Sequence, residues 1–395
     1  MELKKNSDEH VSEFVLFDGP LQDLGRRLGL VRGTNTFGLG VALGLTTWAV
    51  LFVLALLQGS FDKFFSMAVL GVHVRLLLAV PLLFLCETWV APRMADFVRN
   101  LVGTGVVTEK DKPALAAIIR RIGRLSDPWL AEVFFLLLAF GIPLSEWVFG
   151  VQALPGQSGS VATLLTETGG HFGPVLGWYL LFCLPLFRFL ILRWLWHLVL
   201  WCYFLWRVQK LDLQLIPTHP DQTAGLGYLE VVHEHFVPLA AAVSMVYSAC
   251  FAENITSGAM PFETLTLLIP LVFLAVAVLF VGPLFIFSSK LWCCRINGWS
   301  AYMGMASRYV NTFDRKWIQG ENPAAEPLLG TPDMQSLADL NNSVNIVREL
   351  RWIPAGKRLL FSLAAAVIVP LLPLLLLKYP IAELAAKLFQ SLSGL

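Results

Sequence analysis

Charged residues are scarce in this chain of 395 residues: Asp, Glu, Lys and Arg together make up 14% of it. An ordinary soluble domain has about a quarter of such residues. Hydrophobic residues make up 56%, and the mean hydropathy is +0.66. This composition excludes an ordinary soluble enzyme. The formal net charge of +1 lacks the basic excess that attracts nucleic-acid phosphates, so we expect no nucleic acid as a partner.

Several motifs of known chemistry are also missing. The chain has no Walker A loop, no GxSxG nucleophile motif and no GxGxxG dinucleotide motif. Its six cysteines include no CxxC pair. We therefore interpret them as small apolar side chains rather than as a disulfide framework. The polar start, MELKKNSDEHVSEF, has no short apolar core and cleavage site behind it, so we do not interpret it as a secretory signal peptide.

Long apolar runs are what the chain does have. A bilayer-spanning helix needs about 20 predominantly apolar residues. Runs of this kind cover 36–58, 67–90, 128–149, 173–204, 236–256, 264–288 and 359–378. Of the 29 Lys and Arg residues, 23 fall in the odd-numbered segments between these runs. The positive-inside rule then predicts an all-α membrane protein with about seven transmembrane helices, a cytoplasmic N-terminus and an outer C-terminus.

The runs and the segments between them predict a domain plan. A cytoplasmic tail with an amphipathic segment on the inner surface covers 1–35; a six-span bundle with a cytoplasmic helix (108–125) and a loop (212–229) covers 36–288; a cytoplasmic helical cap covers 289–358; the seventh span is 359–378; and an outer-surface amphipathic tail is 379–395. The stretch 172–211 would be roughly 60 Å long as one helix. It must therefore either project into the cytoplasm or bend along the membrane.

The cap should contain two amphipathic helices, one over 299–317 and one that begins after Thr331. The second helix has an apolar stripe from Met334 to Leu350 at helical spacing. We expect this stripe to pack against the first cap helix and against the helix over 108–125.

Three stretches resemble a family of bacterial multi-pass inner-membrane proteins of uncharacterised activity. They are VRLLLAVPLLFLCE at 74–87, LDLQLIPTHPDQTAGLGYL at 211–229 and EPLLGTPDMQSLADLNNS at 326–343. The THPD loop and the EPLLGT segment are the distinctive strings. The resemblance implies location in a bacterial inner membrane, and it brings no activity, substrate or catalytic residue.

Ionisable residues inside the predicted spans are the first candidate site. They are Arg75, Glu87, Glu132, Arg188, Arg193 and His197. The predicted orientation and the helical rise place Glu87, Glu132, Arg188 and Arg193 in the inner half of the membrane. Charges in a membrane are costly, so they face protein or water and usually pair. Two interpretations stay open: interhelical ion pairs that fix the bundle, or a polar pathway or anion site. Arg75 has no obvious acidic partner at its own depth, and Glu146 is the nearest candidate.

The loop after the fourth span is the second candidate site. His219, Asp221 and His233 are ligand types that suit Zn²⁺ or another divalent ion, with Glu234 available as a base. The other interpretation is that His219 and Asp221 only shape a turn between two prolines. The turn is the preferred interpretation, so no cofactor is predicted, and a divalent metal is the alternative.

These observations support a channel or transporter for a small ion or solute with a charge-lined pathway. Two alternatives stay open: a scaffold or accessory subunit of a membrane complex that uses 299–350 as its interface, and a metal-dependent membrane-embedded enzyme or sensor. The expected partners are the lipid bilayer and either a second copy of the chain or another subunit of a membrane complex.

Overall fold

The computed structural model describes residues 14, 16–17, 19–126, 129–149, 173–319 and 332–378. Over these residues the chain forms helices and no strand, so the predicted all-α class is confirmed there. The helices are α2 (Pro20–Arg27), α3 (Phe37–Leu57), α4 (Phe61–Phe64), α5 (Leu70–His73), α6 (Val80–Gly103), α7 (Lys112–Ser126), α8 (Trp129–Phe149), α10 (Pro174–Trp178), α11 (Leu184–Gln209), α12 (Tyr228–Glu234), α13 (Val237–Thr256), α14 (Leu265–Phe280), α15 (Ser288–Phe313), α16 (Pro332–Glu349) and α17 (Lys357–Leu371). The predicted outer tail, 379–395, lies outside the described residues.

Six helical segments of the described chain are long and apolar enough to cross a membrane. They are Phe37–Leu57, Met67–Gly103, Pro174–Gln209, Tyr228–Thr256, Phe262–Phe280 and Lys357–Leu377. The remaining predicted span, 128–149, corresponds to α8, whose apolar stretch within the described residues is the shorter Ala131–Gly141. This set of helices is compatible with an integral, multi-pass membrane protein.

Two of these segments are unusually long. Met67–Gly103 has 37 residues and Pro174–Gln209 has 36, so each is about 55 Å long at 1.5 Å per residue. The stretch predicted at 172–211 is thus one continuous helix. Both helices exceed the roughly 30 Å hydrocarbon thickness of a bilayer. α7 packs against α11, and α12 against α6, along these long helices.

A π-helical segment precedes a proline in each of the two long helices. Val74–Ala79 comes just before Pro81, and Tyr179–Cys183 just before Pro185. Proline has no N–H and its ring clashes with the carbonyl four residues earlier, so the preceding turn widens instead of continuing as a regular α-helix. Arg75 and Tyr179 lie within these widened turns.

Close backbone contact joins α3 to the second of these spans. Gly40 and Gly44 lie four residues apart on α3, the small-xxx-small spacing that lets membrane helices approach closely. A Cβ at Gly44 would overlap the Leu76 carbonyl oxygen, and one at Gly40 would come within 2.7 Å of the Phe84 side chain. In a π turn, the N–H of residue 81 would donate to the carbonyl of residue 76, but Pro81 has no N–H. The Leu76 carbonyl that faces Gly44 therefore does not receive this hydrogen bond.

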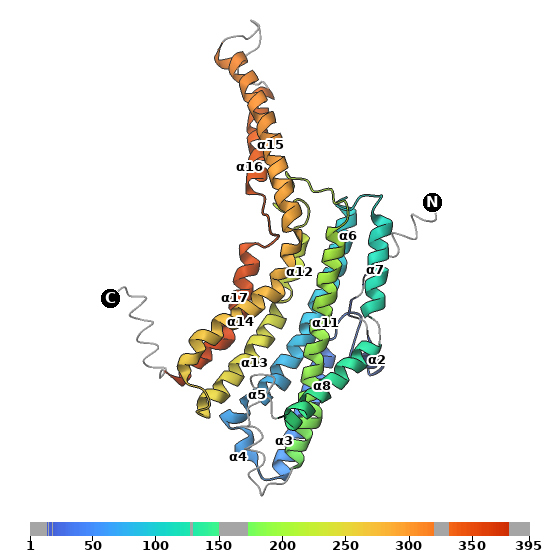
Figure 1. Cartoon of the computed structure of the whole chain (residues 1–395), viewed down its shortest axis with the longest axis vertical. Helices are drawn as coiled ribbons and strands as arrows, with labels where there is room; N and C mark the ends of the chain where they lie inside the picture. The colour runs from blue at the N-terminus through green and yellow to red at the C-terminus, as the bar shows by residue number, and fades with distance from the viewer. Residues whose placement is uncertain are drawn as a thin grey trace, which may run out of the picture.

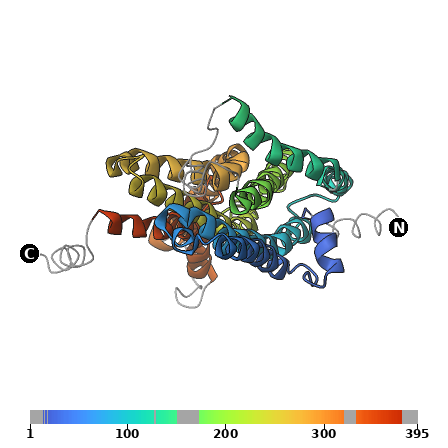
Figure 2. The ribbon, with the colours of Figure 1, turned by 90° about the horizontal axis from the view of Figure 1, so that it is seen from below.

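The helices fall into three groups across the width of the molecule. α14 and α17 lie at one edge, α2 and α7 at the other, and α3, α6 and α11 between them (Figure 1, Figure 2). α13 packs against both α6 and α17 and so joins the middle to one edge. The buried core runs along α6, α11 and α13.

α15 and α16 pack side by side and project from the bundle as a hairpin (Figure 1). The predicted contact between the two cap helices is confirmed, but α15 is one long helix that begins at Ser288 rather than near 299. The expected packing of the stripe against the helix over 108–125 is wrong, because that helix, α7, lies at the opposite edge against α11 (Figure 1). The segment predicted as a helical cap therefore contains a projecting two-helix hairpin.

Candidate functional site

A buried ion pair joins α6 to α11. Arg193 Nη1 lies 2.8 Å from Glu87 Oε2, and Arg193 Nη2 lies 3.2 Å from Glu87 Oε1. Glu87 is 1% exposed and Arg193 3%. The two side chains therefore form the bidentate geometry in which a guanidinium and a carboxylate pair best. The sequence placed both residues in the inner half of the membrane, and the structure brings them together.

Residues before the first span complete this cluster. The Gln22 side-chain amide donates to Glu87 Oε1, and Arg193 Nη2 donates to the Phe17 carbonyl oxygen at 3.2 Å. The Phe17 ring lies 4.7 Å from the His197 ring. We call Phe14, Leu16, Phe17 and α2 the N-terminal segment. Its side chains Phe14, Leu16, Phe17 and Gln22 are buried against the bundle, whereas Leu24 and Leu28 on the other face of α2 are 53% and 62% exposed.

Glu132 and His197 lie at the edge of the same cluster. Glu132 Oε1 is 3.7 Å from Arg193 Nε, and its side chain is 20% exposed. A Cβ at Gly19 would come within 2.6 Å of that same oxygen, so glycine allows the N-terminal segment to pass close to α8. Arg188 is also buried on α11, but five residues separate it from Arg193, which corresponds to about 140° around the helix. We call Gln22, Glu87, Glu132, Arg193 and His197 the inner cluster.

A second polar cluster forms where the two π-helical segments meet. Arg75 Nη1 donates to the Tyr179 hydroxyl at 2.7 Å, and Arg75 Nη2 to Cys250 Sγ at 3.3 Å. Glu253, on α13, is close enough to Arg75 to interact electrostatically with it. The Gly71 backbone N–H donates to Glu253 Oε1 at 2.6 Å. We call Arg75, Tyr179, Cys250 and Glu253 the outer cluster.

Glu253 is the functional candidate that the sequence analysis missed. The expectation that Arg75 lacks an acidic partner is wrong, because Glu253 is 1% exposed and lies beside it. Glu146, the partner suggested instead, has a side chain outside the described part of the structure. An acidic residue near the end of the run at 236–256 was the available signal, and it went unused because distant spans cannot be paired by sequence position alone.

His233 uses both ring nitrogens in contacts within the bundle. Its Nδ1 lies 2.6 Å from the Phe280 carbonyl oxygen, and its Nε2 accepts from Trp201 Nε1 at 3.2 Å. Only a neutral ring protonated at Nδ1 satisfies both contacts. Since a metal ligand needs a nitrogen lone pair, this arrangement leaves His233 none to offer.

Asp221 organises the loop around itself. Its carboxylate accepts from the backbone N–H groups of Thr223, Gly225 and Gly227 at 2.9, 3.1 and 2.8 Å. Burial raises the pKa of Asp221, but these three N–H groups outweigh it, so its pKa lies below the ordinary value of 3.8. His219 Nδ1 lies 2.8 Å from the same carboxylate.

The alternative metal site on His219, Asp221 and His233 is not brought together in the described structure. Among the described residues, no group of three His, Cys, Asp or Glu side chains is arranged to hold a metal ion. His219 and Asp221 are adjacent, while His233 lies on α12 between Trp201 and Phe280. The geometry fits the preferred interpretation, in which His219 and Asp221 shape a turn.

The same loop anchors the chain after the hairpin. The Arg351 guanidinium lies 2.8 Å from Glu230 Oε2 and donates to the Asp221 carbonyl oxygen at 3.2 Å. The Arg351 backbone N–H donates to the Gln222 carbonyl oxygen at 2.8 Å. The distinctive THPD string therefore joins the long helices to the base of the hairpin.

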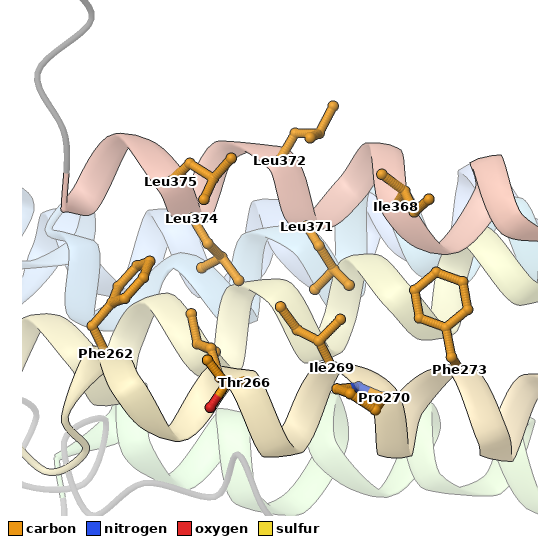
Figure 3. Close-up of a pocket in the computed structure, with 11 residues that line it drawn as sticks. Phe262, Thr266, Ile269, Pro270, Phe273, Ile368, Leu371, Leu372, Leu374 and Leu375 are labelled. Atoms are coloured by element: carbon orange, nitrogen blue, oxygen red, sulfur yellow. The ribbon is translucent and has the colours of Figure 1, made fainter. Parts of the chain in front are cut away.

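An apolar groove lies between α14 and α17 (Figure 3). It has a volume of about 490 Å³ and is lined by Phe262, Leu265, Thr266, Ile269, Pro270, Phe273, Ile368, Leu371, Leu372, Leu374 and Leu375. Lys378 Nζ lies 2.8 Å from Glu263 and 4.9 Å from the centre of the Phe262 ring, at one end of the groove. The lining suits a hydrocarbon chain, and the hydroxyl of Thr266 in this lining donates to the Glu263 carbonyl oxygen at 2.7 Å.

Comparison of the chain with models of protein families, with curated proteins and with solved structures finds no match in any of the three.

Proposed function

We propose that this protein is a transporter or channel for a small ion or solute in a bacterial inner membrane. Its pathway passes the outer and inner clusters, and the N-terminal segment closes the inner end. The alternation of Lys and Arg along the chain and the resemblance in the THPD and EPLLGT strings support this location. The buried charges support the pathway, because their cost in a membrane is tolerated where they serve a polar route.

The contact between the N-terminal segment and the Glu87–Arg193 pair carries the proposal. A buried ion pair is tolerated only when its remaining hydrogen-bonding positions are satisfied. Here a side-chain amide and a backbone carbonyl from outside the spans satisfy them. Water or a polar solute offers the same donors and acceptors. Withdrawal of the segment would therefore open the inner cluster to the cytoplasm without leaving the charges unsolvated.

The outer cluster provides the polar part of the proposed pathway nearer the outer side of the membrane. The Tyr179 hydroxyl, the Cys250 thiol and the Glu253 carboxylate surround one guanidinium, that of Arg75. The two clusters share α6 and α11 with their π-helical segments, so they lie along the same pair of helices. An ion that passes between the helices would meet a cationic group at each level.

Flux in proteoliposomes tests the proposal, with anions and cations measured separately. The double variant Phe17→Ala/Gln22→Ala should raise flux about tenfold or more, because it removes the contacts that hold the segment in place. Arg193→Gln should abolish that increase. The matched control is Arg121→Gln, an exposed arginine on α7 that should leave flux unchanged.

Absence of flux for every ion tested, from wild type and from the double variant shown to be folded by size-exclusion chromatography, would refute a pathway. A different outcome would separate the two parts of the proposal. If wild type and the double variant show equal flux and Arg193→Gln abolishes that flux, the closing role of the N-terminal segment is refuted and the pathway is supported.

A role in assembly is a second candidate, because the α15–α16 hairpin projects from the bundle and exposes large apolar side chains (Figure 1). Co-purification of another membrane protein in fixed proportion, lost when the hairpin is altered, would favour this role over transport.

A further inference from the structure

α15 carries an exposed apolar stripe with the spacing of a coiled coil. We call Trp292, Ile296, Trp299, Met303, Ala306 and Val310 the α15 stripe. Their separations alternate between four and three residues, the a/d pattern of a heptad repeat. On an α-helix these positions fall within about 40° of one line. The stripe therefore forms a single face over nearly three heptads.

This face is distinct from the one that α16 covers. On α15, a Cβ at Gly298 would contact Val347 of α16, and the Tyr309 hydroxyl donates to the Asp333 carbonyl oxygen of α16; both positions lie about a quarter-turn or more from the line of the stripe. Ala306, at the side of the stripe nearer these contacts, is half-buried. Trp292 is 50% exposed, Ile296 49% and Trp299 40%; Met303 and Val310 are 38% and 41% exposed. Exposed apolar area on the stripe is on the order of 400 Å². Patches of that size commonly mark interaction sites.

Lipid does not account for the stripe along its length. α15 has 26 residues and is about 39 Å long, and the hairpin projects away from the ends of α14 and α17 (Figure 1). Val310 lies about 27 Å along the helix axis from Trp292. A headgroup layer could reach the base of the hairpin only, so most of the stripe faces water in a single chain.

We infer that the stripe pairs with the same stripe of a second copy, forming a parallel two-stranded coiled coil on the cytoplasmic side. Two copies in one bilayer share one orientation, so their α15 helices run parallel about an axis normal to the membrane. Anchoring in the bilayer also raises the effective concentration of the partner helix, which lowers the contact area that a stable pair requires.

The charges beside the stripe favour a second copy over a different protein. Residues at the flanking e positions are Cys293, Ser300 and Ser307, and those at the flanking g positions include Arg295 and Tyr302. In a parallel pair the g residue of one helix faces the e residue of the next heptad, so Arg295 meets Ser300 and Tyr302 meets Ser307. No like charges oppose each other, and the flanks lack the acidic and basic pattern that selects a different partner.

A hollow beside the stripe offers a place for a partner side chain. It has a volume of about 390 Å³ and is lined by Trp292, Arg295, Ile296, Trp299 and Arg348. Arg295 Nη2 donates to the Arg348 carbonyl oxygen at 3.0 Å, which fixes the guanidinium at its rim. An aromatic ring from the second copy would fill the hollow and pack beside this cation.

Disulfide cross-linking in native membranes tests the pairing. The background is Cys293→Ser/Cys294→Ser, which removes the two cysteines of α15. Met303→Cys lies on the stripe, and Ala301→Cys, an exposed residue on the opposite face, is the control. Facing a/d positions bring Cα atoms within the 4.4–6.8 Å that a disulfide spans. Mild oxidation should yield at least about tenfold more product of twice the chain's mass with Met303→Cys than with Ala301→Cys.

Equal yields from the two positions, or a Met303→Cys product whose mass identifies a different protein, would overturn the inference. Counting copies by single-molecule photobleaching in dilute vesicles gives a second test. Trp299→Glu/Met303→Glu should weaken dimerisation by about 100-fold or more, since it places charges in the seam of both helices, whereas Ala301→Glu should not. Wild-type chains that stay single, or dimers that survive the double substitution, would also overturn it.

Discussion

At the scale of single residues, the Glu87–Arg193 pair allows a prediction about stability. Its two charges are buried at a desolvation cost that their mutual attraction must offset. Removing one partner leaves the other uncompensated, which costs about 3–5 kcal/mol in buried pairs. We predict that Glu87→Gln lowers the free energy of unfolding by this amount and that the double variant Glu87→Gln/Arg193→Met recovers part of it. Thermal unfolding in a single detergent measures both.

The exposed pair on α2 is the matched control for that prediction. Arg26 Nη1 lies 3.2 Å from Asp23 Oδ1, with side chains 45% and 64% exposed. Solvent screens such a pair, so Asp23→Asn should change stability by no more than about 1 kcal/mol. Similar losses for Glu87→Gln and Asp23→Asn would show that the inner pair is not desolvated as described.

Asp221 allows a prediction about pH. Its pKa in the folded protein is lowered, so its contribution to stability is fully present above the ordinary pKa of 3.8 and is lost as pH falls through the folded value. We predict that wild type loses stability on acidification below about pH 4. Asp221→Asn should be less stable at neutral pH by about 1.5–3 kcal/mol and should lose less on acidification, measured by unfolding across pH. An unchanged acid slope in Asp221→Asn would contradict this account of the loop.

At the scale of the element, Gly44 tests how α3 meets the second span. Gly44→Ala places a methyl group against the Leu76 carbonyl oxygen, which cannot move without disturbing the π-helical segment. We expect a loss of about 1–3 kcal/mol, the usual cost of overpacking. The control is Gly123→Ala on α7, where nothing lies within 4 Å of an added Cβ and where alanine favours the helix. A loss of equal size at Gly123 would show that contact at Gly44 is not the cause.

The apolar runs predicted the helices well because spanning helices must satisfy their hydrogen bonds internally, which makes long apolar stretches diagnostic. Their ends were harder to place. The second run was expected to end at residue 90, but α6 continues to Gly103 because its polar last turns pack against α12. Polar residues end an apolar run without ending a helix.

The sequence predicted which residues belong to the candidate site, but it did not predict which of them pair with one another. Rarity of charge within the runs identified Glu87 and Arg193, and helical depth placed both in the inner half. Pairing Arg75 with Glu253, or His233 with Trp201, depends on which spans lie side by side, and the sequence carries no record of that. Burial of Phe17 and Gln22 was not predicted for the same reason, since an amphipathic pattern fits a membrane surface and a protein surface equally.

At the scale of the whole molecule, orientation in the membrane is a prediction that rests on charge alone. The hairpin and the C-terminal ends of α6 and α11 lie at one end of the molecule, and α4 lies at the other (Figure 1). The segments predicted to be cytoplasmic hold 23 of the 29 Lys and Arg residues, which retain a segment on the inner side during insertion. The hairpin end should therefore face the cytoplasm.

Thiol labelling measures this orientation directly. Cys293 is exposed on α15, so a membrane-impermeant maleimide should label it in inside-out vesicles and not in intact spheroplasts. In a Cys293→Ser background, Asp62→Cys in α4 is exposed at the opposite end and should show the reverse pattern. Labelling of Cys293 from outside would invert the topology, and the N-terminal segment would then close the outer end of the proposed pathway. Labelling from inside keeps the inner cluster on the cytoplasmic side, where withdrawal of that segment would admit ions.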